Sequence, residues 1–438
     1  MPHISIEEPP LSSEMPPENY NSNPLTCICH DAKQGGGIMS ALRKGNKGKV
    51  LLRTAFVFLM ILAISFATAH AAQPIKIGVA YGLQGMWSDW CKKNIVAVEM
   101  AVAEINAAGG VNGMPLETII YDTASKPAEA TRLVRKLATD DKVLAILGPF
   151  SSSEAEVAFP VGNRIGIVMI SQASSKPGVA AANRPYAFRN KIDELQLAIP
   201  TMKKWKAHYN IKTVAIVHDA KDAVSRVLGT MVLPGVSKKL GLKVVNEGNF
   251  VTYTTGDFDM RPQVTKLKGM QFDGLVFGGV YMDGVTFIKE ARRQGLNQPM
   301  MGGNPLMSLQ FPRKGGKAAD GVFTSSEFYY WMDTPKVQKF TKEFIKRAKA
   351  KGIDPPEPLQ FDVNVYDAIY MLAHVMKQNG ITNKPEDLAR DREQIMKGLT
   401  DLKDFPGLAR KGQFNEAGDA VGDVYVVKAQ GGEWVLVE

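Results

Sequence analysis

Short apolar runs alternate with amphipathic helical stretches along most of this chain, and this alternation limits the folds that are open to it. The runs at 75–80, 143–147 and 213–218 consist mostly of aliphatic or β-branched residues. Such runs are typical of parallel strands that are covered on both faces by crossover helices. The pattern extends to about residue 190 and starts again at 212, so we predict an α/β protein with two doubly wound parallel-sheet lobes.

The second half of the chain adds further elements to this pattern. A single strand is predicted over 243–250, and two long helices are predicted over 335–351 and 361–379. A β-hairpin then follows, with strands at 424–428 and 434–437 on either side of two glycines. A chain that adds helices and then a hairpin to two lobes is expected to cross between the lobes more than once.

Serine-rich loops follow two neighbouring strands of the predicted first sheet. The segment 145–177 contains a strand, the loop GPFSSS, a helix, the strand IVMI (167–170) and the loop SQASSKP. Carboxyl ends of parallel strands meet at one edge of a sheet, where open α/β folds bind ligands. Hydroxyls and N–H groups at such an edge, beside a helix N-terminus, favour small anions such as carboxylates. The pattern indicates a binding protein.

An export signal is predicted before the first lobe. Residues 43–72 combine a basic stretch, a short apolar run and small residues, and they contain Ala69-His70-Ala71. This layout is typical of a cleaved secretory signal, so we expect a signal peptide over 39–71 and a periplasmic protein. An uncleaved anchor is the alternative, although the run is short for a membrane span. Residues 1–38 read as a disordered leader, which signal peptides rarely carry. We therefore expect translation to start at Met39, and a genuine disordered extension is the alternative.

Composition and motifs exclude several other classes of protein. Cys91 is the single cysteine after residue 71, which rules out an intramolecular disulfide there. Basic residues are scattered over helices without an aromatic-interleaved patch, so nucleic acid is not expected as a partner. His208, His218 and His374 lack metal-ligand spacing, and no catalytic or phosphate-binding motif is present. We therefore expect no enzymatic activity, no metal and no cofactor.

Segments spread along the chain point to one protein family. IKIGVAYGLQGMWSDW (75–90), AVAEINAAGGVNGMPLE (101–117), ILGPFSSSEA (146–155) and GQFNEAGD (412–419) occur in this order. Together they resemble the solute-binding proteins of the branched-chain amino acid (leucine/isoleucine/valine) type, which serve ATP-driven importers. The resemblance implies the type I periplasmic binding protein fold, with three crossovers between lobes that close on a ligand.

The resemblance assigns roles to residues near the serine-rich loops. Ser152 matches a serine whose hydroxyl meets the ligand carboxylate, and Ser175 matches a residue that offers it a hydroxyl and an N–H. Ala173 matches a backbone carbonyl that accepts from the ligand ammonium group, and Trp90 matches an aromatic residue of the first loop.

Three departures from the family pattern concern the ligand amine. Asn304 stands where amino acid binders place an acid that pairs with the ligand ammonium. Ala223 stands where they place a tyrosine, and a second tyrosine matches Val280 or Tyr281, depending on register. Because an unpaired buried ammonium costs several kcal/mol, we expect a carboxylate ligand without an α-ammonium group.

Aromatic residues gather at the same loops. They include Trp87, Phe150 and the run 328–331, and flat rings prefer aromatic neighbours in offset or edge contact. We therefore favour an aromatic acid, with a branched-chain or other amino acid or an amide as the alternative ligand. The expected ligand-binding residues are Trp90, Phe150, Ser152, Ala173, Ser174, Ser175, Tyr281, Asn304 and Phe328.

Structural roles compete with binding at several of these positions. Ser151 with Glu154, and Ser153 with Glu156, match the S-x-x-E capping box, so both serines are expected to cap a helix. Arg189 lies beside the first expected crossover, where an ion pair is favoured over a ligand role.

The complete hypothesis is a solute-binding protein that captures a small carboxylate and, as a monomer, delivers it to an ABC permease in the inner membrane. A ligand sensor that serves a regulator is the alternative of another class. The N-terminal lobe is expected over 72–191 and 327–410, and the C-terminal lobe over 192–326 and 411–438.

Overall fold

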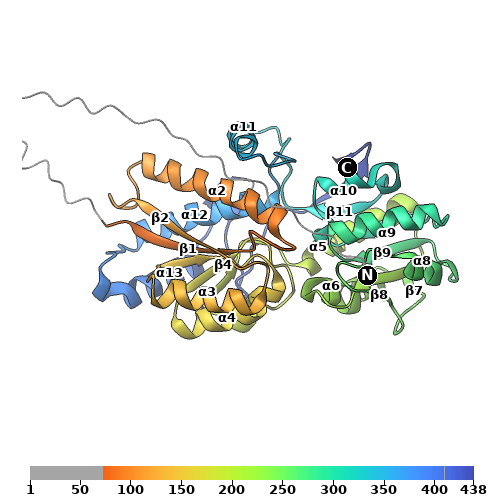
Figure 1. The fold of residues 1–438 in the computed structure, drawn as a ribbon, viewed down its shortest axis with the longest axis horizontal. Coiled ribbons are helices and arrows are strands. Elements are labelled where there is room, and N and C mark those ends of the chain that lie inside the picture. Colours follow the sequence, from red (N-terminus) through yellow and green to blue (C-terminus); the bar gives the residue numbers. More distant parts are fainter. Residues whose placement is uncertain (1–72, 409) are drawn as a thin grey trace, which may run out of the picture. The chain divides into compact units, whose positions relative to one another are not determined.

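The computed structural model describes residues 73–408 and 410–438, which form two α/β lobes (Figure 1). The predicted leader and signal peptide, residues 1–71, lie outside the described residues. Each lobe is built on its own sheet, and in the first lobe the helices cover both faces of that sheet. The predicted fold class, two doubly wound α/β lobes, is confirmed.

The first lobe contains a five-stranded parallel sheet in the order β2-β1-β3-β4-β5. The strand β1 lies between β2 and β3 and places Val79 opposite Ile120 on one side and Leu147 on the other. Its apolar residues are fully buried because helices cover both faces, as the continuous apolar runs predict. The strands are β1 (Ile75–Tyr81), β2 (Leu116–Asp122), β3 (Ala145–Leu147), β4 (Val168–Ser171) and β5 (Ala187–Arg189).

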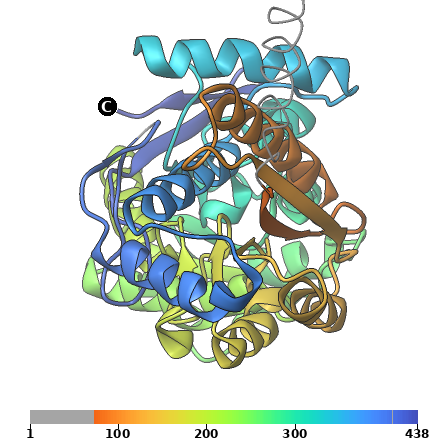
Figure 2. The same ribbon diagram turned by 90° about the vertical axis from the view of Figure 1, so that its left-hand side faces the viewer.

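Helices from both ends of the chain complete the first lobe. Helix α12 packs along α2, although the two are far apart in sequence. Figure 2 shows the blue C-terminal helices among the orange and yellow elements of the chain's first part. These helices are α2 (Ser88–Ala107), α3 (Pro127–Thr139), α4 (Ser152–Ile165), α11 (Pro335–Ala350), α12 (Gln360–Gln378) and α13 (Leu388–Asp401).

The second lobe contains an eight-stranded mixed sheet, with the path β15-β14-β11-β10-β9-β6-β7 and β8 paired to β6. Its strands are β6 (Thr213–Asp219), β7 (Lys243–Val244), β8 (Val251–Tyr253), β9 (Gly274–Gly278), β10 (Met300–Gly302), β11 (Phe323–Ser326), β14 (Tyr425–Gln430) and β15 (Glu433–Leu436). Its helices are α5 (Glu194–Tyr209), α6 (Ala223–Val227), α7 (Leu233–Lys239), α8 (Arg261–Lys268), α9 (Tyr281–Arg293) and α10 (Gln310–Gly315).

The C-terminal hairpin explains why the chain crosses between the lobes three times. β14 and β15 pair antiparallel around Gly431 and Gly432, which both have positive φ, so the predicted hairpin is confirmed. β14 also pairs antiparallel with β11 and thereby joins the second sheet. The chain therefore passes from β5 to α5, from β11 to α11, and from α13 back to β14. The boundaries at 191, 326 and 410 stay predictions.

The strand predicted over 243–250 is wrong. In the structure the short strand β7 covers only residues 243–244, a turn follows, and the next strand, β8, begins at residue 251. The side chain of Asn246 replaces the missing strand pairing: its Oδ1 accepts from the Ile216 N–H at 3.0 Å, and its Nδ2 donates to the Ile216 carbonyl at 2.8 Å. Gly248 then turns the chain at a φ of 76°.

Candidate ligand-binding site between the lobes

The turn between β3 and α4 places a serine hydroxyl at the edge of the first sheet. Gly148 has a φ of 112°, and a Cβ there would lie 2.4 Å from the Ala80 carbonyl oxygen, so glycine is required. Ser151 is the N-cap of α4: its hydroxyl accepts from the Glu154 N–H, and the Glu154 carboxylate accepts from the Ser151 N–H. This capping box, predicted from sequence, leaves Ser152 at the first position of the helix.

Both lobes line a small cavity at this helix start, which we call the aromatic cavity. Its volume is about 30 Å³. The first lobe provides four aromatic rings and three serines, and the second lobe provides Val224, Asn304 and Pro305. None of the described residues that line it is acidic or basic. The first-lobe residues are Trp87, Trp90, Phe150, Ser151, Ser152, Ala173, Ser175 and Phe361.

The Ser152 hydroxyl is oriented to donate a hydrogen bond. Its oxygen accepts from the Ser174 hydroxyl at 3.1 Å and from the Lys176 N–H at 3.2 Å. With both acceptor positions of Oγ filled, its own hydrogen is left for another acceptor. Ser152 is 3 % exposed and lines the cavity, so this hydrogen is available to an anion or a carbonyl oxygen that enters the cavity.

Ser175 is held by a buried acid at the start of α5. Its hydroxyl donates to Glu194 Oε1 at 2.9 Å, and the other carboxylate oxygen accepts from the Asn304 N–H at 3.2 Å. Burial raises the pKa of Glu194 to about 6, although nearby Lys191 and these two hydrogen bonds oppose the rise. Ionised Glu194 therefore accepts the hydroxyl hydrogen of Ser175. Protonated Glu194 can instead donate to the Ser175 oxygen, which leaves the Ser175 hydrogen free for a ligand.

Aromatic rings form the wall around Trp90. Its ring centroid lies 5.9 Å from that of Phe150, 6.0 Å from that of Phe361 and 5.8 Å from that of Trp87. Tyr281 of the second lobe packs edge-on against it at 4.9 Å. The indole nitrogen of Trp90 is buried and has no hydrogen-bond partner within the described part of the chain. A donor in this condition is available to a ligand.

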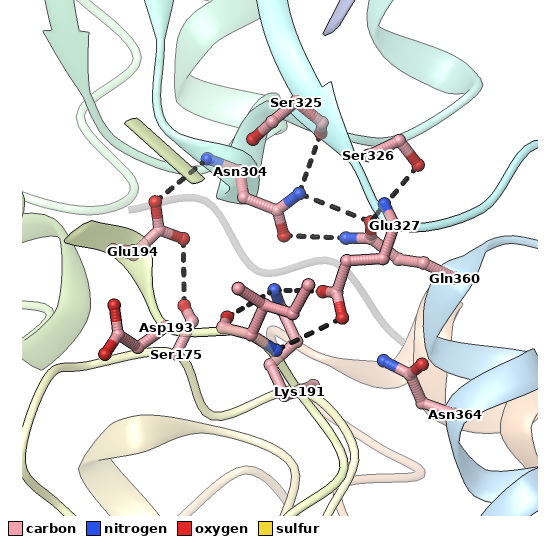
Figure 3. A network of polar contacts seen from close by, with 12 residues as sticks. Ser175, Lys191, Asp193, Glu194, Asn304, Ser325, Ser326, Glu327, Gln360 and Asn364 are labelled. Carbon is pink, nitrogen blue, oxygen red and sulfur yellow. Dashed lines mark hydrogen bonds and ion pairs between the residues drawn. The ribbon is translucent and has the colours of Figure 1, made fainter. Parts of the chain in front are cut away.

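Asn304 lies at the centre of a polar network that connects the lobes (Figure 3). Its Nδ2 donates to the Ser325 carbonyl at 2.7 Å, and its Oδ1 accepts from Gln360 Nε2 at 2.6 Å. Below it, Glu327 pairs with Lys191 and lies 3.0 Å from Arg410. The amide of Asn304 is therefore committed to neighbouring protein groups.

A buried ion pair supports the second serine loop from below. Arg189 is fully buried, and its Nε lies 2.6 Å from Asp419 Oδ1. Its Nη1 donates to the carbonyl oxygens of Ser174 at 3.1 Å and Lys176 at 2.6 Å. The structural ion pair predicted at Arg189 is therefore confirmed, and it fixes the loop that contains Ser175.

The two lobes touch across the site. The Tyr281 hydroxyl donates to Asp89 Oδ2 at 2.6 Å. The Ser153 hydroxyl lies 3.4 Å from Asp222 Oδ1 and accepts from the Ala223 N–H at 3.3 Å. Ser153 therefore bridges the lobes, and the capping role predicted for it with Glu156 is wrong, because that acid pairs with Lys176 instead.

Six of the nine predicted ligand-binding residues line the aromatic cavity, and three lie behind it. Ser174 is buried and donates to Ser152, and Tyr281 supports Trp90 from the second lobe. Phe328 points into the core instead, because the Ser326 hydroxyl ties the turn that follows β11. The residues at the cavity are Trp90, Phe150, Ser152, Ala173, Ser175 and Asn304.

Sequence reasoning missed several residues of the site. Phe361 and Gln360 lie at the start of a long helix, and Glu194 is the first residue of another, so each has the sequence pattern of an ordinary helix N-terminus. Val224 comes from the short helix α6 and Pro305 from a single 3-10 turn of helix after β10, and neither segment contains a motif. Except for Pro305, these residues are fully or nearly fully buried, which the sequence does not show.

Neither a metal-binding cluster nor a membrane-spanning helix occurs among the described residues. No group of three or more potential metal ligands occurs within residues 73–408 and 410–438. None of the helices in these ranges combines the length and hydropathy that a bilayer crossing requires.

Comparison with known proteins places this geometry in a family context. Residues 74–433 match the family model described as periplasmic binding protein. The Leu/Ile/Val-binding protein of Escherichia coli K12 is 26% identical over 366 residues, which cover 81% of this chain and 95% of that protein.

Solved structures share the fold at lower identity. A branched-chain amino acid transporter substrate-binding protein from Streptococcus pneumoniae, in complex with isoleucine, is 24% identical with a TM-score of 0.70 and covers 83% of this chain and 100% of its own. A solute-binding protein of an ABC transporter from Rhodopseudomonas palustris BisB5, in complex with 3,4-dihydroxybenzoic acid, is 21% identical with a TM-score of 0.69. That match covers 82% of this chain and 95% of that chain.

Proposed function

The chain belongs to the periplasmic binding protein family, and we propose that it captures an aromatic carboxylate without an α-ammonium group for an ABC importer. Like its relatives, it is a binding protein of the transporter type and not an enzyme. In this proposal it acts in the periplasm as a monomer, and its closed form presents both lobes to a membrane permease.

The composition of the aromatic cavity is the observation that supports this ligand class. A carboxylate that enters it meets the unused hydrogen of Ser152 and the first turn of α4. A helix N-terminus and hydrogen-bond donors together favour an anion. An aromatic ring then contacts Trp90, Phe150 and Phe361 in the offset and edge arrangements that rings prefer.

An α-ammonium group would find no comparable partner. No described residue that lines the cavity has a carboxylate, and the Asn304 amide is already bonded to Ser325 and Gln360. Burying an unpaired ammonium costs several kcal/mol. The cavity therefore favours a carboxylate whose remaining surface is apolar.

Binding requires the lobes to move apart and close again. The cavity of about 30 Å³ is smaller than the ~150 Å³ that holds a benzene molecule in a protein core. The closing contacts, Tyr281 with Asp89 and Ser153 with Asp222, each join two lobes. A ligand shifts the protein towards the closed form only if it makes more favourable contacts in the closed form than in the open form.

The pH dependence of binding is the first test. Binding an anion beside Ser175 raises the pKa of Glu194 further, because like charges disfavour ionisation. Glu194 has a pKa of about 6 in the free protein, so it takes up a proton on binding. We expect affinity for benzoate to rise as pH falls from 8 to 5.5, by up to about tenfold, the equivalent of one pKa unit of coupling.

Calorimetric titration at several pH values, with a Glu194→Gln variant as the control, measures this effect. Glutamine retains an acceptor for Ser175 but does not titrate, so the affinity of the variant for benzoate is expected to stay constant between pH 8 and 5.5. A ligand with an ammonium group would instead need ionised Glu194, so its affinity would decrease as the pH is lowered. A fall in benzoate affinity below pH 6 would contradict the proposal.

A branched-chain amino acid is the second candidate ligand. The names of the Escherichia coli and Streptococcus pneumoniae proteins support it. In this chain it requires Glu194 as the partner of the ammonium group, because this buried acid contacts both Ser175 and Asn304. The opposite pH dependence described above would favour this candidate.

A further inference from the structure

A second cavity lies against the aromatic cavity, and we call it the lysine cavity. Its volume is about 270 Å³, and it includes Lys92, Lys93 and Lys351 of the first lobe and Ser308 and Gln310 of the second. It is several times larger than the aromatic cavity and, like it, lies between the lobes.

The two cavities are neighbours along the same contact between the lobes. Trp90 lines both of them. The start of α12 provides Leu359 to one and Phe361 to the other, and the segment after β10 provides Ser308 to one and Pro305 to the other. Trp90 is therefore the residue that the aromatic cavity and the larger, polar lysine cavity share.

Buried polar atoms without partners occur at this boundary. The indole nitrogen of Trp90 and the side-chain oxygen of Gln310 are both buried and unpaired within the described residues. Both residues line the lysine cavity. Native proteins rarely leave such atoms unsatisfied, so an unpaired donor and an unpaired acceptor beside one cavity indicate a polar occupant.

The charges around the lysine cavity favour an anionic occupant. Lys93 is 4 % exposed; its ammonium donates to the Glu357 carbonyl and lies 3.9 Å from Asp362 Oδ2. An ammonium has three donors, so one remains beyond these two contacts. Lys92 adds an exposed charge, and Lys351 pairs with Glu99 at 2.8 Å.

Two acids oppose these cations. Asp354 also lines the lysine cavity, and so does Asp89. The Asp89 carboxylate is engaged by the Tyr281 hydroxyl, which partly satisfies it. Of the three lysines in the lining, Lys93 and Lys351 have acid partners outside the cavity, and Lys92 has none among the described residues. Lys92 and the spare donor of Lys93 are therefore the cationic groups open to an occupant.

We propose that the ligand spans both cavities: its carboxylate meets Ser152, its ring lies against Trp90, and a second polar group, best a carboxylate, enters the lysine cavity. This inference rests on the proposed function. It also solves the problem of space, because a ring that is too large for about 30 Å³ has its neighbouring room in the cavity of about 270 Å³. Movement of the Trp90 ring joins the two spaces.

Two ligands that differ only at the far end of the molecule test the proposal. 4-Carboxycinnamate places a carboxylate in the lysine cavity, and 4-methylcinnamate places a methyl group of similar size there. We expect the protein to bind 4-carboxycinnamate at least about tenfold more tightly by calorimetry, the effect of one charge-assisted hydrogen bond.

Substitutions then locate the source of the preference. Gln310→Leu and Lys92→Gln are each expected to reduce the affinity ratio of the two cinnamates at least about threefold. Lys339→Gln removes an exposed charge on α11 that lines neither cavity, and it is expected to leave the ratio unchanged. Equal binding of the two cinnamates, or an unchanged ratio in both cavity variants, would overturn this inference alone. A protein that binds benzoate but neither cinnamate would also overturn this inference alone, whereas a protein that binds neither benzoate nor a cinnamate would overturn the proposed function and this inference with it.

Discussion

Replacing Ser152 with alanine is expected to weaken the binding of an aromatic carboxylate about tenfold to a hundredfold. The substitution removes the one hydroxyl whose oxygen already accepts two hydrogen bonds and whose hydrogen is therefore left for the ligand. A hydrogen bond to a charged group contributes about 1.5–3 kcal/mol, and each 1.4 kcal/mol is tenfold in affinity. Calorimetric titration of the variant with benzoate measures the loss.

Ser151→Ala is the matched control for this substitution. Ser151 caps α4 and exchanges hydrogen bonds with Glu154, so its loss is expected to lower the free energy of unfolding by about 1 kcal/mol. Its hydroxyl already donates to Glu154 at 2.6 Å, and binding is expected to fall much less than in the Ser152 variant. Equal losses of affinity in the two variants would show that helix capping, and not donation by Ser152, holds the ligand.

Replacing Arg189 with methionine is expected to lower the free energy of unfolding by about 3–5 kcal/mol. The guanidinium is fully buried and pairs with Asp419, so methionine leaves a buried carboxylate without its partner. The loop carbonyls of Ser174 and Lys176 also lose their donor. Denaturant unfolding followed by fluorescence measures the stability, and benzoate affinity is expected to fall as well because the loop contains Ser175.

Two further variants separate the buried pair from simple charge loss. Arg293→Met removes an exposed cation that pairs with Glu290, and it is expected to change stability by less than about 1 kcal/mol. The double variant Arg189→Met with Asp419→Leu removes both buried charges and is expected to recover part of the loss. A double variant that is less stable than Arg189→Met alone would contradict this explanation.

Much of the fold could be predicted because local pattern and tertiary structure agree. The continuous apolar runs became buried parallel strands, and the Gly431-Gly432 pair became the turn of the hairpin. The strand at 243–250 failed because a side chain, Asn246, took over the hydrogen bonds of a neighbouring strand. Strand propensity does not reveal that a side chain will replace the backbone pairing of a strand.

The candidate site could be predicted only where a loop pattern marks it. Ser152 and Ser175 follow strands in recognisable serine-rich loops, and both lie at the aromatic cavity. Glu194 and Phe361 lie at the starts of helices α5 and α12, and no local motif marks them as site residues. Crossovers between the lobes bring these helix starts to the site, and no local pattern records that placement.

The most direct test of the central claim compares two ligands that differ only in the α-ammonium group. 3-Phenylpropanoate and phenylalanine have the same ring, chain and carboxylate. Because an unpaired buried ammonium costs several kcal/mol, we expect the protein to bind 3-phenylpropanoate at least about a hundredfold more tightly by calorimetric titration at pH 7. Equal or tighter binding of phenylalanine would contradict the claim and would assign Glu194 as the partner of a ligand ammonium.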